Sequence, residues 1–400
     1  MRSSISGDRQ LAVGQAEAAE PKPPPRRVPW GALAQQAVTI AAVAALIVWL
    51  GQNVARNLAA SGMTGGFGFL WQEAGFAMSF SLVEMTEEST YFRVFIAGLL
   101  NTIFVAGLAL AFATLLGFGV GLARVAPARP LRVASRIYVE TLRNLPLLLV
   151  LIFLQSVVLR SLPVVRDAID LGGGIHLSNR GIYFPWPAAG PDAWIALVLS
   201  SAATVAIVFA WTLRPRTPVR SWRDFALSLA ATMIAGLMLV SAAGSVAWER
   251  PEFQGFDFRG GAKMMPEFAA LLLALALYNA AFIAEIVRAG VQSVNRGQIE
   301  AAHSLGLKHG FIQHRIVLPQ AFRLMVPPLT NQYVHLIKAS SLATVVGFPD
   351  LVAVFLGTSL NQTGRAVEIV AMTAAVYLTL CMGIGALSSA WNHRVRLKER

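Results

Sequence analysis

Apolar residues gather along the chain in eight long runs. Each run has roughly the 20 residues that an α-helix needs to cross the hydrocarbon core of a bilayer. We therefore predict an all-α polytopic membrane protein with about eight transmembrane helices. The predicted spans cover about 31–51, 93–123, 142–160, 193–213, 225–246, 266–288, 327–347 and 366–391.

The first run raises the alternative of a secretory signal peptide. About 30 residues precede it, however, and no small-residue cleavage site follows it cleanly. We interpret it as an uncleaved membrane anchor. The residues before it are rich in proline and arginine from Pro21 to Arg27, which favours a disordered cytoplasmic tail over residues 1–30.

Polar segments divide the chain into parts. Two of them, 52–92 and 161–192, are rich in glycine and predict loops with short amphipathic pieces. The two spans after the second loop have no charged residue in their interior, so we interpret 161–265 as an insertion that carries two extra spans. The predicted parts are a tail 1–30, an anchor helix and periplasmic loop 31–92, a first core part 93–160, the insertion 161–265, a second core part 266–391 and a tail 392–400.

Basic residues set the predicted orientation of the spans. When the N-terminus is placed in the cytoplasm and the spans alternate, 23 Lys and Arg residues fall on the cytoplasmic side and 9 on the other. This bias follows the positive-inside rule, so both termini are predicted to be cytoplasmic. The formal net charge of +12 then reports membrane topology, and we expect no binding to nucleic acid.

Composition agrees with a membrane protein and argues against several other classes. Charged residues make up 14% of the chain, whereas a soluble domain carries about 25%. A single cysteine, Cys381, excludes a disulfide framework, and six scattered histidines leave little room for a metal centre. The chain has no Gly-x-x-x-x-Gly-Lys-Ser/Thr motif, so we expect no ATP hydrolysis, no bound cofactor and no enzyme site within it.

One predicted cytoplasmic loop, 296–322, contains helix signals. Residues 298–305 are good helix formers, and Gly306 stands where a left-handed C-cap belongs. A second short helix is predicted over 309–318, with Pro319 ending it. An inert connection would not explain an alanine-rich, glycine-capped hairpin in the cytosol, so we favour a docking element for a soluble partner.

Polar residues inside the spans are candidates for a translocation path, because they are costly in hydrocarbon. Glu285 and Arg288 stand three residues apart and can pair, so we favour a structural ion pair over contact with a substrate. Lys338 is predicted mid-way along the seventh span, where a structural anchor and a path-lining residue are about equally compatible with the sequence. The other candidates are Ser340 and Ser341 beside it, and Asn279 and Asn331, for which hydrogen bonds between helices are the simpler explanation.

The loop also resembles a known motif. Glu300-Ala301-Ala302, followed by Gly306 and by Leu318-Pro319, resembles the EAA loop of ATP-binding-cassette (ABC) importer permeases. The segments 138–148, 285–290 and 338–342 resemble the polar amino-acid permease subfamily, and the long insertion resembles the larger permease subunit of general L-amino-acid importers. Ala339-Ser340 departs from many such relatives, which have an acidic or amide residue and then threonine.

The resemblance implies a bacterial inner-membrane permease that imports polar or general L-amino acids by alternating access. It implies that loop 296–322 sits in a groove of a cytoplasmic ATPase dimer, which would supply ATP hydrolysis. The implied coupling contacts are Glu300, Ala301, Ala302, Gly306, Leu318 and Pro319. The other implied partners are a second permease subunit or a copy of this chain, membrane lipid, and a periplasmic amino-acid-binding protein docked on the loops 52–92 and 161–192.

Three alternatives stay open on the sequence. A permease for another small solute would carry the same loop. An ion-coupled secondary transporter would need acids within the spans, where Glu285 is the one well inside and has Arg288 nearby. A non-transporting scaffold would use the loop to recruit a cytoplasmic protein.

Overall fold

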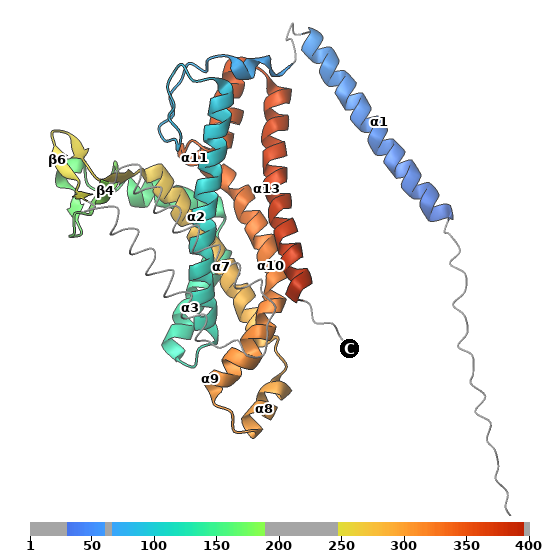
Figure 1. Cartoon of the computed structure of the whole chain (residues 1–400), viewed down its shortest axis with the longest axis vertical. Helices are drawn as coiled ribbons and strands as arrows, with labels where there is room; N and C mark the ends of the chain where they lie inside the picture. The colour runs from blue at the N-terminus through green and yellow to red at the C-terminus, as the bar shows by residue number, and fades with distance from the viewer. Residues whose placement is uncertain (1–29, 61–65, 189–246, 396–400) are drawn as a thin grey trace, which may run out of the picture. The chain divides into compact units, whose positions relative to one another are not determined.

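A computed structural model of the chain describes residues 30–60, 66–188 and 247–395 (Figure 1). The described residues divide into two separate units, 30–60 and the described residues from 66 onward. The first unit contributes α1, Trp30–Ala60, whose stretch Ala34–Asn53 is long and apolar enough to cross a membrane. The predicted spans 193–213 and 225–246 lie outside the described residues.

Three further described helices could each span a bilayer on their own. They are α2 (Tyr91–Val125), α7 (Pro266–Gln292) and α13 (Ala366–Val395), the last through its stretch Ala366–Ala390. A bent pair, α3 (Arg129–Arg143) and the segment Leu147–Leu159, adds another if the two are taken as one span. The described chain is thus mostly helical with several membrane-capable helices, and the predicted fold class is confirmed.

Shorter helical elements complete the second unit. They are η1 (Phe67–Trp71), α4 (Leu147–Ile152), η2 (Phe153–Leu159), η3 (Val165–Asp167), α8 (Arg296–Ser304), α9 (His309–Ile312), η4 (Gln313–Val317), α10 (Leu318–Ala339), η5 (Ser340–Leu342), α11 (Ala343–Val346), η6 (Val352–Ser359) and α12 (Leu360–Thr363). Of these, η2, η4 and η6 are π-helical.

The close approach of α2 and α7 forms the centre of the bundle. Small residues recur every fourth position along α2, at Ala109, Ala113, Gly117 and Gly121, and all four are buried. A Cβ atom built on Gly121 would lie 2.6 Å from the Cβ of Val287. Such stripes let helix backbones approach closely in a membrane, where dispersion contacts replace the hydrophobic effect as the driving force.

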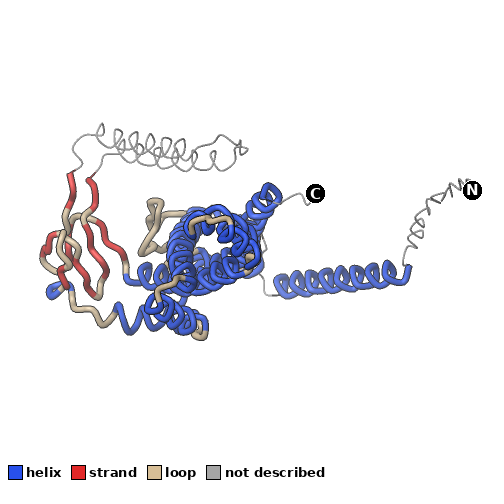
Figure 2. Tube along the Cα trace, turned by 90° about the horizontal axis from the view of Figure 1, so that it is seen from below, coloured by secondary structure: helices blue, strands red, loops and turns tan. Residues whose placement is uncertain are grey.

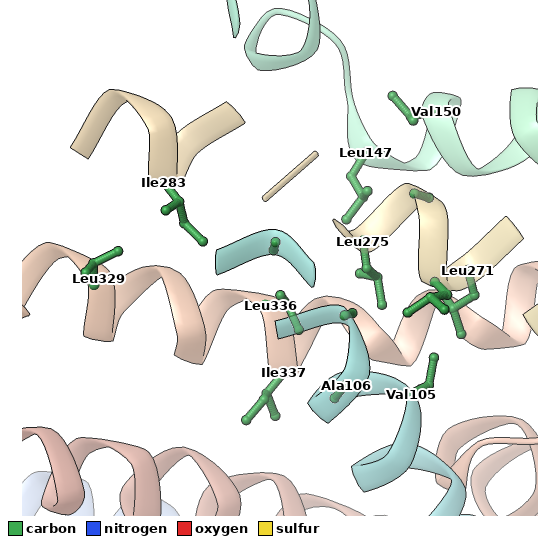
Figure 3. Packing of buried hydrophobic residues seen from close by; sticks show 14 of the residues in the cluster. Val105, Ala106, Leu147, Val150, Leu271, Leu275, Ile283, Leu329, Leu336 and Ile337 are labelled. Carbon is green, nitrogen blue, oxygen red and sulfur yellow. The ribbon is translucent and has the colours of Figure 1, made fainter. Parts of the chain in front are cut away.

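Two other helices join this core. α4 contributes Leu147 and Val150 to the cluster that contains Leu271 and Leu275 of α7. α10 contributes Leu336 and Ile337 to the same cluster (Figure 3). The main core is therefore built from four helices that lie far apart in the sequence.

Pro319 does not end a helix, contrary to the sequence-based prediction. The chain runs from α9 through the π-helical turn η4 directly into α10, and Pro319 lies in the first turn of α10. The N–H of Leu318 bonds to the carbonyl of Gln313, five residues back. This wider turn accommodates a residue that has no N–H to donate and would clash in an ordinary helix interior.

The predicted seventh span is displaced as a result. The sequence suggested 327–347, but α10 begins at Leu318 and ends at Ala339. Its interior carries Pro327 and Pro328. Lys338 is consequently the next-to-last residue of the helix rather than a mid-span residue, and its side chain is exposed.

Part of the insertion folds as strands, where the sequence predicted loops. Figure 2 shows these strands together at one side of the helices. β1 (Ile169–Asp170), β2 (His176–Ser178), β3 (Gly181–Phe184) and β8 (Ala262–Met264) form an antiparallel sheet in that order. Two antiparallel strand pairs accompany it: β4 (Trp186–Ala188) with β5 (Ala247–Glu249), and the hairpin of β6 (Glu252–Gln254) with β7 (Asp257–Arg259).

Aromatic and charged side chains hold these strands together. The Phe258 ring stacks 4.5 Å from His176 and lies 4.8 Å from Tyr183. Lys263 Nζ lies 3.1 Å from the Asp257 carboxylate, and the Tyr183 hydroxyl also bonds to Asp257. Partial burial would raise the pKa of Asp257, but these two donors and the Phe258 N–H lower it below its ordinary value.

Adding one methyl group to α2 tests the close approach. We expect Gly121→Ala to lower the stability of the protein by about 1–3 kcal/mol, because the new Cβ overpacks against Val287. Gly119→Ala is the matched control, since a Cβ there meets nothing within 4 Å. Thermal unfolding of the purified protein in detergent measures both. Equal melting temperatures for the two variants would contradict the packing described.

Candidate functional site

The helix α8 is capped at both ends. The Asn295 side chain accepts a hydrogen bond of 2.8 Å from the N–H of Gly297 at the N-terminus. At the C-terminus Gly306 has φ = 72°, its N–H bonds to the His303 carbonyl, and the Leu307 N–H bonds to the Ala302 carbonyl. These two bonds make a Schellman motif, which confirms the predicted helix and its glycine C-cap.

One face of α8 is presented outward and the other is packed. Glu300 and Ala301 are exposed, and Leu305 is 79% exposed although it is a large apolar residue. Ala302 is buried in the main core cluster instead. Of the remaining predicted coupling residues, Gly306 and Pro319 are exposed and Leu318 is half-buried.

The hairpin is tied to the bundle through the start of α10. Gln320 Nε2 donates a hydrogen bond of 2.6 Å to Gln298 Oε1 of α8. Ile312, directly before the π-helical turn, and Val317, its last residue, are buried in the main core cluster. α8 is thus held on the end of the bundle (Figure 1), with its exposed face free to meet another molecule.

A charge cluster lies in the C-terminal half of α7, the half that leads to α8. Glu285 pairs with Arg288 on its own helix, as the sequence predicted, at 3.1 Å from the Arg288 Nε to Oε1. It also pairs with Arg124 at the end of α2, and Arg143 Nη1 at the end of α3 lies 3.8 Å from Oε2. One carboxylate therefore joins three helices, and three guanidinium groups surround it.

Comparison with known proteins decides the family. The model of the family described as "Binding-protein-dependent transport system inner membrane component" matches residues 259–397. The putative amino-acid ABC transporter permease protein YhdX of Escherichia coli is 43% identical over 377 residues, covering 91% of this chain and 94% of its own length. The general L-amino acid transport system permease protein AapQ of Rhizobium johnstonii is 39% identical over 371 residues, with 91% and 92% covered.

This chain belongs to the amino-acid ABC transporter permeases. The family places it in the inner membrane as a multi-pass protein. The match also covers α8 and α10, so the exposed hairpin belongs to the part of the permease that the family model recognises.

Most of the other predicted path residues of the permease are exposed or are engaged in hydrogen bonds within the bundle. Asn279 is fully buried, donates to the Leu275 carbonyl and accepts a hydrogen bond of 2.7 Å from Gln332 Nε2 of α10. Gln332, rather than its neighbour Asn331, thus joins α10 to α7, and Asn331 is exposed. The remaining candidates lie near the end of α10: Lys338 is exposed, Ser340 is buried and bonds to the Ile337 carbonyl, and Ser341 is half-buried and bonds to the Lys338 carbonyl.

Sequence analysis missed a buried acid of the permease, Asp350. Its side chain is fully buried and accepts a hydrogen bond of 2.8 Å from the Ala353 N–H. Thr102 of α2 accepts another, at 3.0 Å, from the Leu351 N–H. Both groups satisfy N–H donors at a helix start, and an aspartate directly before an apolar run is the signal that could have revealed the cap.

Neutralising Glu285 tests the charge cluster. We expect Glu285→Gln to lower stability by about 1–3 kcal/mol, because three guanidinium groups then face one another without a carboxylate. Glu140→Gln removes the same charge from an exposed pair with Arg136 and should cost about 0.2–1 kcal/mol. Chemical or thermal unfolding in detergent compares the two. A loss of stability at Glu285 no larger than the loss at Glu140 would show that the charge cluster does not stabilise the fold.

Proposed function

We propose that this permease is one membrane subunit of an ABC importer that moves polar or general L-amino acids into the cytoplasm by alternating access. The observation that carries the proposal is the capped helix α8, which is fixed to the bundle yet presents Glu300, Ala301 and its C-cap residue Leu305 outward. The substrate class is supported by the names of relatives that match nearly the whole chain.

The proposal assigns ATP hydrolysis to a separate subunit. The exposed face of α8 would dock into a cytoplasmic ATPase dimer, with Glu300 pairing with a basic side chain there. This chain would bind no cofactor itself and would meet ATP through that partner. We also infer a second permease subunit or a second copy of this chain, a periplasmic amino-acid-binding protein, and cytoplasmic termini, the last from the distribution of basic residues.

The charge cluster fits an ion-coupled secondary transporter less well than it fits an ABC importer. Such a transporter needs an acid that can take up and release its coupling ion. Glu285 is instead held by Arg124 and Arg288, with Arg143 close by. Asp350 acts as a helix cap. The ABC importer is therefore the function that these groups support best.

Two glycines of the hairpin test the coupling role. A Cβ at Gly306 or at Gly310 meets nothing within 4 Å, but Gly306 alone of the two has a positive φ, 72°. We expect Gly306→Ala to strain the C-cap by about 1 kcal/mol and to lower ATP-driven uptake several-fold. Gly310→Ala should leave uptake near the wild-type rate.

The measurement is uptake of labelled L-amino acids by proteoliposomes that hold the chain, its partner subunits and the binding protein. Glu300→Ala should also lose uptake while the chain still inserts. Uptake that does not require ATP, but is lost when the proton gradient is dissipated, would favour the secondary transporter. ATPase binding without flux of any amino acid would favour the scaffold or a permease for another solute.

A further inference from the structure

The helix α3 is sharply bent away from the segment that follows it in the chain. It meets the segment Leu147–Leu159 at 104°, and that segment runs into the core, where Leu147 and Val150 pack with α7. A helix bent by this much from a core-packed segment cannot run parallel to it. In Figure 1, α3 lies in the half of the bundle that carries α8 and α9.

Residues of α3 divide among three faces. Ser135 and Val139 are buried, and Val139 packs with Ala281 and Ala284 of α7. Arg129, Arg132 and Arg136 follow one another at spacings of three and four, so they form a single exposed stripe, the arginine stripe. The third face lies next to the arginine stripe and opposite the buried residues. It carries Val133 and Ile137, which are 49% and 61% exposed.

This combination matches helices that lie in the membrane interface. Such helices bury an apolar face at the level of the acyl chains and direct basic side chains toward the headgroups. Val133 and Ile137 supply the apolar face, and the arginine stripe supplies the charge. Glu140 lies 2.7 Å from the Arg136 guanidinium, so the stripe keeps a net positive charge.

We propose that α3 rests in the membrane interface and that the arginine stripe binds the phosphate groups of anionic phospholipids. The charge of the stripe complements these headgroups, and arginine suits phosphate because its planar fork donates two parallel hydrogen bonds. Arg143, on the same helix, is engaged by Glu285 and by the ring of Phe282, 5.4 Å away, so it anchors α3 to the bundle rather than to lipid.

A probe on α3 can read out this contact. Cys381 is the chain's single cysteine, so Cys381→Ser with Ile137→Cys gives one labelling site. The labelled chain is assembled with partner subunits freed of accessible cysteine, in vesicles of phosphatidylcholine with added spin-labelled phosphatidylglycerol or spin-labelled phosphatidylcholine. We expect the anionic lipid to quench the fluorophore with an apparent affinity about five-fold higher or more, and the preference to fade at about 1 M salt.

Matched variants separate charge from structure. Replacing all three stripe arginines by glutamine should abolish the preference, and replacing them by lysine should largely keep it. Glu140→Gln should increase it, since a competing carboxylate is removed. A label at Leu115 of α2, which is 73% exposed on an uncharged helix segment, should be quenched equally by both lipids.

Two results would overturn the proposal. One is equal quenching by both lipids at position 137 in low salt, or a glutamine variant that behaves like the parent. The other is a label that neither lipid quenches but that the ATPase shields, which would show that a protein covers this face. Neither result depends on whether the complex transports amino acids.

Discussion

Backbone proximity between α2 and α7 is the constraint on which the rest of this permease depends. In lipid, apolar side chains gain little by leaving their surroundings, so helices associate through close dispersion contacts and hydrogen bonds. Gly117 and Gly121 supply the closeness, because any Cβ at these positions would meet Ile283 or Val287 at 2.6 Å. The same approach brings Arg124 within reach of Glu285.

Polar groups in the core mostly secure helix ends and helix pairs. Asp350 and Thr102 accept hydrogen bonds from backbone N–H groups at the start of one helix. Asn101 donates to the Pro349 carbonyl at 2.8 Å, and Gln332 donates to Asn279. The Asp350 bond caps its own helix, and the bonds of Thr102, Asn101 and Gln332 each fix one element against another that is distant in sequence. A buried polar group that lacks a hydrogen-bond partner destabilises a fold more than an apolar group in its place. These bonds therefore also favour this one arrangement of the helices.

Local signals in the sequence were sufficient for much of the fold. Apolar runs marked α1, α2, α7 and α13, and the cap residues of α8 identified that helix and its end at Gly306. The prediction failed at Pro319, because a π-helical turn is not visible in residue periodicity. It also failed in the insertion, where strands of two to four residues are too short to show alternation.

The candidate site shows the same division between local and distant information. Glu285 and Arg288 are three residues apart, so their pairing could be predicted. Arg124 and Arg143 join them through helix packing, which no spacing rule reports. Lys338 was placed mid-span because its helix was expected to begin at 327 rather than at Leu318.

The helical run from His309 to Ala339 is continuous, so it forms one long arm that begins beside α8. At 1.5 Å per residue the arm is about 45 Å long, so a tilt of about 5° at the α8 end moves the other end by about 4 Å. Pro327 and Pro328 remove two hydrogen-bond donors near its middle. The arm is therefore easiest to flex one turn before Gln332, where it is bonded to α7. A displacement applied at the α8 end of the arm would therefore be divided at this bond to the buried Asn279.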